Sequence, residues 1–353
     1  MKERRSILFL CAAMTAITTM AESLGLALSG GGAKGAYEVG VWQALHEAGL
    51  VGDVAAISGS SIGAVNAALF ASRPAPDVAG KLWLANLGSA FLPNERIFEI
   101  ASKKKFAEFL AARQREYAEI AGVPAENLPA DAMQAIEKEA KSDFTRKGLL
   151  KSVAAALDAY RRTSAGEAAD GLCDGDALRT VLGSNLPLDW PRSAPCVYAT
   201  VLSNGDWTLR RFRLNGAAPH DRTKMLLAST AIPVVFPPVE IDGKTYVDGG
   251  WERQGGDNVP IGPILDCHPD IKTIIVVYLD DERHEPRERV ERVRRAAAAK
   301  DVAIVEIFPS EDIGGTIFGW EGVVDTSKDT ARKLIELGRR DAMRILQKKG
   351  MKK

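Results

Sequence analysis

The chain has 353 residues, which is enough for one large domain or two modest ones. Apolar residues make up 46% of it and charged residues 26%, an ordinary composition for a globular protein that argues against a disordered or fibrous chain. Lys and Arg together number 46, as do Asp and Glu, so no net charge attracts the protein to nucleic acid or to an anionic membrane. We therefore expect no nucleic-acid partner.

Residues 1–21 differ from this average. Three basic residues near the start are followed by a mostly apolar run from residue 6 onward, which is typical of a secretory signal with a cut after Ala21. The run is shorter than the roughly 20 apolar residues that a spanning helix needs. Two alternatives stay open: an uncleaved anchor, and a true start at Met20. A real signal predicts an exported or membrane-associated protein, in the periplasm or secreted; otherwise we expect a cytoplasmic one.

The predicted elements of the first part of the chain follow a repeated order. They are a strand at 24–28, a glycine-rich loop at 29–35, a helix that ends near Gly49, a strand at 54–57, a turn at 58–63 and a small-residue helix at 64–69. Strand, glycine turn and helix in repetition are typical of an α/β sheet with parallel strands.

The middle of the chain, from about residue 86 to 190, is rich in Ala, Glu, Lys and Arg. Helices are predicted at 104–121, 130–141 and 147–162, with Pro and Gly breakers between them. We interpret this stretch as a helical insertion, or cap, in the α/β domain. The alternative is that these helices simply cover the sheet.

Strand signals return in the last part of the chain. Strands are predicted at 196–202, 207–214, 245–248, 271–279 and 302–308, with an Asn204-Gly205 turn between the first two and a closing helix from a Thr326 cap towards Leu346. The alternating charges of 287–295 indicate a solvated helix face, with membrane contact as the alternative.

Gly59-Ser60-Ser61-Ile62-Gly63 fits the pattern G-x-S-x-G and lies between a predicted strand and a predicted helix. A nucleophile elbow needs such a tight turn, and the two glycines relieve its crowding. The helix start offers partial positive charge and the free N–H of Ile62 where an oxyanion would form. The pattern favours Ser61 as a nucleophile, although serines and glycines are also common at ordinary turns.

The loop Gly30-Gly31-Gly32-Ala33-Lys34-Gly35 also fits the dinucleotide fingerprint G-x-G-x-x-G. A dinucleotide site needs an acidic residue at the end of the second strand, but Asp53 precedes that strand. Loops at the carboxyl ends of adjacent parallel strands lie on one edge of the sheet, so the N–H groups of Gly31 and Gly32 are expected to converge with that of Ile62 in an oxyanion hole. We interpret Lys34 as a solvated loop charge, with phosphate contact as the alternative.

A serine nucleophile needs a base. None of the four histidines (His46, His220, His268 and His284) stands in a recognisable catalytic context. Asp248 follows a predicted strand and precedes Gly249-Gly250, which makes it a carboxylate beside an open turn. An isolated Asp-Gly-Gly is more often only a turn, and that alternative stays open here.

Metal and disulfide patterns are missing from the sequence. Beyond the leader, Cys173, Cys196 and Cys267 form an odd set without close spacing, which predicts free thiols rather than a disulfide framework or a zinc site. We expect no metal and no cofactor.

Taken together, Gly30–Gly35, Gly59–Gly63 and Asp248–Gly250, in this order, resemble the three signature blocks of patatin-like phospholipases of the bacterial type. The segment Ala228–Pro238 is similar to the one that usually precedes the aspartate, and the resemblance covers about residues 23 to 350. It implies a three-layer α/β/α fold with a mainly parallel central sheet and a helical insertion.

The resemblance also implies a Ser–Asp dyad without histidine, with Ser61 as nucleophile, Asp248 as base and Gly30, Gly31 and Gly32 with Ile62 as oxyanion hole. The expected reaction is hydrolysis of fatty-acyl esters of lipids or phospholipids, with transient contact to a membrane surface. One departure concerns the rim of the site: residues 251–257 intervene before the Asn258-Val-Pro260 segment.

Three rival functions remain at this level. The first is a catalytically silent lipid-binding or scaffold protein of the same fold. The second is a dinucleotide-binding oxidoreductase, and the third is an α/β-hydrolase triad that uses His268 or His284. The sequence does not separate phospholipase, lysophospholipase and esterase activity, and it predicts no oligomeric state.

Overall fold

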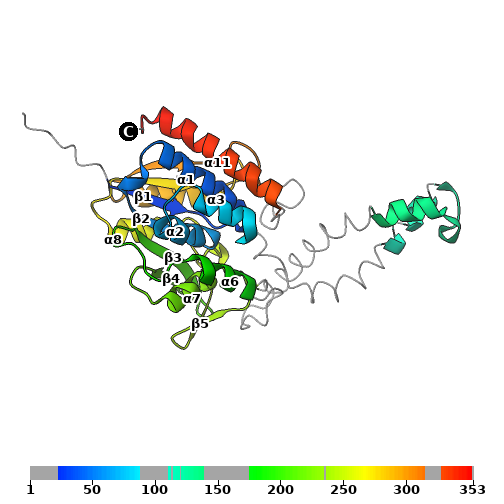
Figure 1. Cartoon of the computed structure of the whole chain (residues 1–353), viewed down its shortest axis with the longest axis horizontal. Coiled ribbons are helices and arrows are strands. Elements are labelled where there is room, and N and C mark those ends of the chain that lie inside the picture. Colours follow the sequence, from blue (N-terminus) through cyan, green and yellow to red (C-terminus); the bar gives the residue numbers. More distant parts are fainter. Residues whose placement is uncertain are drawn as a thin grey trace, which may run out of the picture.

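The computed structural model describes residues 23–87, 110–112, 114–119, 121–138, 175–233, 236–314 and 327–351. The predicted leader at 1–21 and the predicted helix at 147–162 lie outside these residues. The large body of the molecule is built around one sheet (Figure 1).

The central sheet has eight strands. They are β1 (Leu24–Leu28), β2 (Val54–Ser60), β3 (Cys196–Ser203), β4 (Leu209–Arg213), β5 (Val239–Ile241), β6 (Lys244–Asp248), β7 (Thr273–Val277) and β8 (Ala303–Ile307). Their order is β5-β6-β3-β2-β1-β7-β8, with β4 also paired to β3. The five strands from β3 to β8 in this order pair in parallel, while β4, β5 and β6 are antiparallel additions at one end. The predicted mainly parallel sheet is confirmed.

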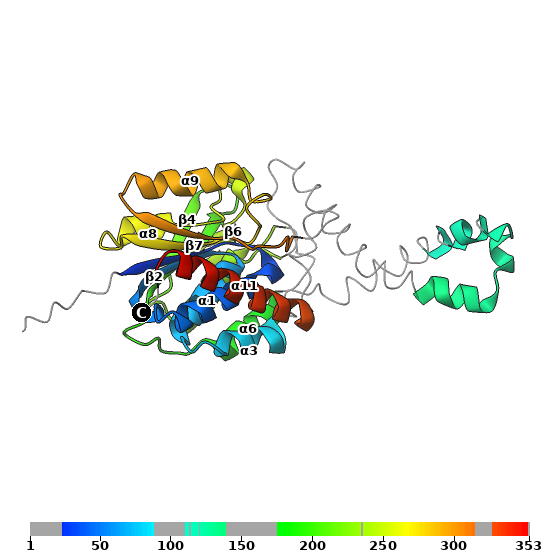
Figure 2. The same ribbon diagram turned by 90° about the horizontal axis from the view of Figure 1, so that it is seen from above.

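Helices cover both faces of the sheet (Figure 2). One layer contains α1 (Ala36–Glu47), α2 (Ile62–Ser72), α3 (Val78–Leu82) and α11 (Lys328–Lys348), and the other contains α8 (Gly262–Cys267) and α9 (Arg287–Ala298). Side chains alternate along a strand, so Leu26 and Leu28 of β1 enter the core under α1, α2 and α11, whereas Ala27 enters the core under α8 and α9. The fold is therefore the expected three-layer α/β/α arrangement.

Two helices that the strand and glycine patterns did not indicate flank the antiparallel end of the sheet. They are α6 (Asp176–Asn185) and α7 (Pro219–Ser229), and α7 packs against β3, β5 and β6. The described residues also include short helical turns, which are η1 (Gly32–Gly35), η2 (Val51–Asp53), η3 (Trp83–Leu87), η5 (Ala125–Asn127) and η6 (Glu252–Gln254). The end of α7 becomes important at the candidate site.

Helical residues also occur within 110–119 and 130–138, inside two of the predicted helices. Figures 1 and 2 draw them apart from the sheet. The predicted division into a domain at 23–350 with an insertion at 86–190 stays a prediction, because much of that insertion lies outside the described residues. Within the described part of the chain, no helix combines the length and the apolar character needed to cross a membrane.

Two predicted boundaries are wrong. Trp207 takes a left-handed φ of 56°, so the strand after the Asn204-Gly205 turn begins only at Leu209. The closing helix is capped by Ser327 rather than Thr326, because the Ser327 side chain accepts the Thr330 N–H.

Candidate active site

The pairing of β3 places Ser61 and Asp248 at the same point of the sheet. β2 pairs in parallel with the first part of β3 and its last residue, Ser60, lies opposite Thr200. β6 pairs with the end of β3, where Asp248 lies opposite Val201. The other edge of β3 is occupied by β4 along this stretch, so β6 continues the edge at which β2 stops. The end of β6 therefore meets the turn that follows β2.

Ser61 sits in a strained turn between β2 and α2. Its φ of 53° and ψ of −126° are rare for a residue with a side chain, and they mark a sharp strand-to-helix elbow. The flanking glycines are required for space. A Cβ on Gly59 would lie 2.3 Å from the backbone carbon of Gly63, and one on Gly63 would lie 2.6 Å from the carbonyl oxygen of Leu28.

The end of α7 holds the backbone of both residues. Ser229 Oγ accepts the N–H of Ser61 at 3.0 Å and donates to the carbonyl of Thr200 at 2.7 Å. Two residues later, the carbonyl of Ala231 accepts the N–H of Asp248 at 2.9 Å. The segment that sequence resemblance linked to the aspartate thus supports the serine as well. The two hydrogen bonds of the Ser229 hydroxyl had no signal in the sequence, because Ser229, Ser61 and Thr200 lie on elements that are far apart along the chain.

Asp248 is buried, with 4% of its surface exposed. One carboxylate oxygen, Oδ1, accepts the Gly250 N–H at 2.7 Å, while Oδ2 is buried without a hydrogen-bond partner among the described residues. Burial raises the pKa of Asp248 to about 6, and the nearby Ser61 hydroxyl and Gly250 N–H oppose this rise because they favour the charged form. The site thus holds a carboxylate with one unengaged oxygen and an increased affinity for a proton.

The glycine loop lies directly beside Ser61. A Cβ on Gly30 would be 3.1 Å from Ser61 Cβ and 2.5 Å from Asn258 Oδ1, so a side chain at this position would force its neighbours to shift. Gly30 itself donates its N–H to the carbonyl of Asn258 at 3.1 Å. Gly31 caps η1, Gly32 is its first residue and Ile62 is the first residue of α2. The first N–H groups of a helix have no partner within it. In the described part of the chain, the N–H groups of Gly31, Gly32 and Ile62 therefore remain candidate oxyanion donors. The N–H of Gly30, which was also expected in the oxyanion hole, is instead bonded to Asn258 and fixes the loop.

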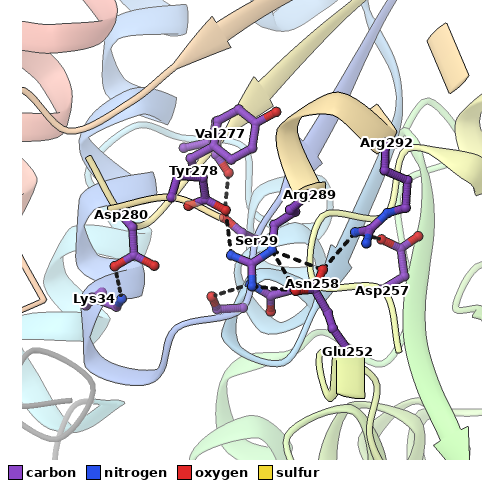
Figure 3. Close-up of polar contacts among 12 residues, drawn as sticks. Ser29, Lys34, Glu252, Asp257, Asn258, Val277, Tyr278, Asp280, Arg289 and Arg292 are labelled. Atoms are coloured by element: carbon purple, nitrogen blue, oxygen red, sulfur yellow. Dashed lines mark hydrogen bonds and ion pairs between the residues drawn. The ribbon is translucent and has the colours of Figure 1, made fainter. Parts of the chain in front are cut away.

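Lys34 is not a solvated charge, so that prediction is wrong. Its side chain is 5% exposed, and its Nζ forms an ion pair of 2.8 Å with Asp280, which follows β7 (Figure 3). The next residue, Gly35, packs so tightly on α2 that a Cβ would lie 2.5 Å from Ile62. The loop is thus anchored to β7 on one side and to α2 on the other, and Lys34 is engaged within the protein rather than offered to a ligand.

A buried polar group also ties the loop to the elbow helix. Asn66 of α2 donates to the carbonyl of Gly35 at 2.9 Å and to Glu38 Oε2 at 2.8 Å, and its Oδ1 accepts the Trp83 indole N–H at 3.0 Å. Burial raises the pKa of Glu38 well above its usual range, which favours a neutral acid there. The sequence pattern missed both residues.

All four histidines lie within the residues that the structure describes, and none of them forms a hydrogen bond with Ser61 or Asp248. His268 contacts the Tyr198 hydroxyl at 3.0 Å, and His284 contacts Asp281 at 2.9 Å. His46 faces the carbonyl of Pro74, and His220 lies in the first turn of α7. These positions argue against a histidine triad at Ser61.

Side chains with metal-ligand spacing occur once among the described residues, as the group Asp281, His284 and Asp312. The guanidinium of Arg283 faces both oxygens of Asp281, at 3.3 and 3.2 Å. The carboxylate that a metal would share is therefore already paired with a cationic side chain. The dinucleotide alternative is also disfavoured, since Asp53 lies in η2 and not at the end of β2.

The rim after Asp248 differs from a simple turn, as the departure at 251–257 indicated. Glu252 of this loop is bound by Arg289 and Arg292 of α9 (Figure 3). The side chain of Arg289 is only 13% exposed. The interpretation of 287–295 as a purely solvated face is therefore wrong for this residue, although the helix itself is present.

The sequence matches the patatin-like phospholipase family model over residues 26–265, more than half of the chain. The chain belongs to the patatin-like phospholipase family. Among single proteins, the lysophospholipase nte1 of Aspergillus terreus (strain NIH 2624 / FGSC A1156) is 57% identical over 49 residues, which are 14% of this chain and 3% of that protein. The chain thus spans a very small part of this relative's own length.

Solved structures similar to this patatin-like protein include VipD from Legionella pneumophila, with 18% identity, a TM-score of 0.47 and coverage of 93% of this chain and 67% of that one. Another is human GIVD cytosolic phospholipase A2 in complex with methyl γ-linolenyl fluorophosphonate, with 11% identity, a TM-score of 0.42 and coverage of 94% and 58%.

Proposed function

We propose that this protein is a serine acyl hydrolase that cleaves fatty-acyl esters of lipids through Ser61 and Asp248. Family membership supports a lipid ester as substrate. The observation that supports the dyad most is that β2 and β6 pair with successive parts of the same edge of β3. The buried carboxylate of Asp248, which has an oxygen without a hydrogen-bond partner among the described residues, therefore lies next to the strained serine turn.

In the proposed reaction, Ser61 Oγ attacks the ester carbonyl and Asp248 Oδ2 takes the hydroxyl proton. The negative charge of the tetrahedral intermediate falls on the former carbonyl oxygen, which accepts hydrogen bonds from the N–H groups of Gly31, Gly32 and Ile62. The intermediate collapses with loss of the alcohol, which receives the proton from Asp248, and leaves an acyl ester on Ser61. Water then attacks that ester and gives a proton to Asp248. Asp248 returns this proton to Ser61 Oγ as the fatty acid leaves, which restores the serine hydroxyl and the carboxylate.

The energetics agree with these roles. One oxyanion donor is worth about 3 kcal/mol of barrier in acyl transfer, so the glycine loop contributes on the scale of a catalytic side chain. A carboxylate with its usual pKa is a weak base, and the burial of Asp248, which raises its pKa to about 6, makes it a better proton acceptor near neutral pH.

Product analysis tests this function. Wild-type protein and the Ser61→Ala variant are incubated with mixed phospholipids and lysophospholipids, and the released fatty acids and remaining lipids are measured by mass spectrometry. We expect fatty-acid release by the wild type alone. The pattern of products separates phospholipase, lysophospholipase and general esterase activity. Equal release by both proteins, or by neither, contradicts the proposal, and the latter outcome favours a silent lipid-binding protein.

A further inference from the structure

We propose that Asn258 is a positioning residue that sets the spacing between the oxyanion loop and the Asp248 turn, and that a charged cluster joining α9 to the loop before Asn258 holds it in place. The rim cluster consists of Glu252, Asp257, Glu285, Arg289 and Arg292. This inference rests on the proposed function, because it assigns a role in the same site.

Asn258 touches both loops at once. Its backbone carbonyl accepts the N–H of Gly30 at 3.1 Å, and its Nδ2 donates to the carbonyl of Gly30 at 3.3 Å. Its Oδ1 lies only 2.5 Å from where a Cβ would be on either Gly30 or Gly250. The amide therefore fills the space between the two glycines, and its position fixes how far apart the loops stand.

The chain between Asp248 and Asn258 is itself tied back to the base turn. Glu252 donates its N–H to the carbonyl of Gly250 at 2.9 Å, and Asp257 donates its N–H to the carbonyl of Gly249 at 2.8 Å. Residues 249–257 thus form a small closed loop whose two ends lie side by side. Asn258 follows directly, so any movement of this loop moves the amide.

Within the rim cluster, Arg289 and Arg292 of α9 bind the carboxylates of this loop (Figure 3). Arg289 donates to Glu252 through Nε at 3.0 Å and Nη2 at 2.7 Å, and also bonds Glu285. Arg292 bridges Glu252 at 2.8 Å and Asp257 at 3.0 Å.

These contacts are more than isolated surface pairs. The side chains of Arg289 and Glu285 are 13% and 1% exposed, and the Arg289–Glu252 contact has the forked geometry that gives strong, directional hydrogen bonds. Such a network resists motion better than an exposed pair does. A displacement of about 1 Å at reacting groups can cost roughly 100-fold in rate, which is the reason for a rigid support.

The test compares Glu252→Gln, Arg292→Gln and Asn258→Ala with a matched control, Arg294→Gln. Arg294 lies on the same helix and forms the same forked pair, but with Glu306 of β8 and not with the rim loop. Two readouts are used on the full chain: kcat and KM for a p-nitrophenyl ester, and hydrogen exchange of the peptide that contains Gly30.

We expect Asn258→Ala to lower kcat by about 100-fold and Glu252→Gln by about ten-fold, with KM nearly unchanged, because the loops lose their spacing rather than their binding surface. Exchange at Gly30 should accelerate in the same order, while Arg294→Gln changes neither readout. Arg292→Gln leaves the buried Arg289 in place, so we expect it to lower kcat less than Glu252→Gln does. This variant also tests the cluster if Glu252→Gln folds poorly.

The proposal is overturned if the rim variants behave like Arg294→Gln, or if kcat falls without faster exchange at Gly30. Failure of the proposed function looks different, since wild-type protein would then show no Ser61-dependent turnover. The exchange measurement still decides the positioning role in that case, because it requires no activity.

Discussion

Ser229 and Ser61 are joined by a buried hydrogen bond in which Ser229 Oγ accepts the Ser61 N–H at 3.0 Å. The same hydroxyl donates to the carbonyl of Thr200, so it bridges the elbow to β3. The residue after next, Ala231, holds the backbone of Asp248. One helix end thereby supports both members of the proposed dyad, and its integrity should matter for activity as much as for stability.

Replacement of Ser229 by Ala tests this support. The Ser61 N–H and the Thr200 carbonyl would both lose a buried partner, so we expect a loss of about 1–3 kcal/mol in the free energy of unfolding and a slower reaction of Ser61 with a fluorophosphonate. Ser72→Ala is the control, because Ser72 is also buried but bonds only Ala68 within α2. A Ser229→Ala protein as reactive as the Ser72→Ala protein would contradict the supporting role.

The raised pKa of Asp248 links activity to stability. Since the folded protein binds this proton more tightly than the unfolded chain does, the contribution of Asp248 to the free energy of unfolding falls by about 3 kcal/mol as pH rises from about 4 to about 6. Asp248→Asn keeps the acceptor for Gly250 but cannot ionise. We expect it to be inactive, yet more stable than wild type above pH 6 and similar to it at pH 4.

Chemical denaturation at several pH values measures this gap, and exposed Asp270→Asn serves as the control. Wild-type turnover should rise with pH through about 6, because the base must be charged to accept a proton. A stability difference between wild type and Asp248→Asn that does not vary with pH would rule out the buried, titrating carboxylate.

The close approach of the Gly59 and Gly63 backbones predicts that no side chain is tolerated at position 59. Alanine there would place its Cβ 2.3 Å from the backbone of Gly63, and backbone atoms cannot move aside as a side-chain end can. We expect Gly59→Ala to lower the free energy of unfolding by about 3 kcal/mol or more and to abolish fluorophosphonate labelling. Gly52→Ala, where no atom lies within 4 Å of the new Cβ, should change neither. Thermal unfolding of the two proteins gives the comparison.

The histidines provide a negative prediction. His268 bonds Tyr198 and His284 bonds Asp281, away from the dyad contacts. The double variant His268→Ala, His284→Ala should therefore react with fluorophosphonate at the wild-type rate. Loss of labelling in a folded double variant would instead favour a histidine triad.

Local sequence signals were sufficient for the parallel part of the fold. The apolar runs at β1, β2 and β7 and the glycine turns after the first two strands each have a signature within a few residues, and the structure has strands and turns there. The conformation at Ser61 was also predictable, because only glycines at 59 and 63 leave room for it.

Features that depend on distant pairing were not predictable in this way. The meeting of Asp248 with the Ser61 turn arises because β2 and β6 share one edge of β3, and no local pattern encodes that. For the same reason the sequence indicated a solvated Lys34. Its ion-pair partner, Asp280, lies far along the chain and has no local signal. The charge pattern likewise indicated an exposed Arg289, because its partner Glu252 lies on a different, distant segment.

The Ser61–Asp248 dyad is tested by labelling with a fluorophosphonate probe, with the modified residue located by mass spectrometry of peptides. The probe reacts with a serine only when that serine is activated. We expect a single adduct on Ser61 in the wild-type protein, no adduct in Ser61→Ala, and strongly slowed labelling in Asp248→Asn despite its greater stability. An adduct at another residue, or equal labelling of folded Asp248→Asn and wild type, would contradict the proposed dyad.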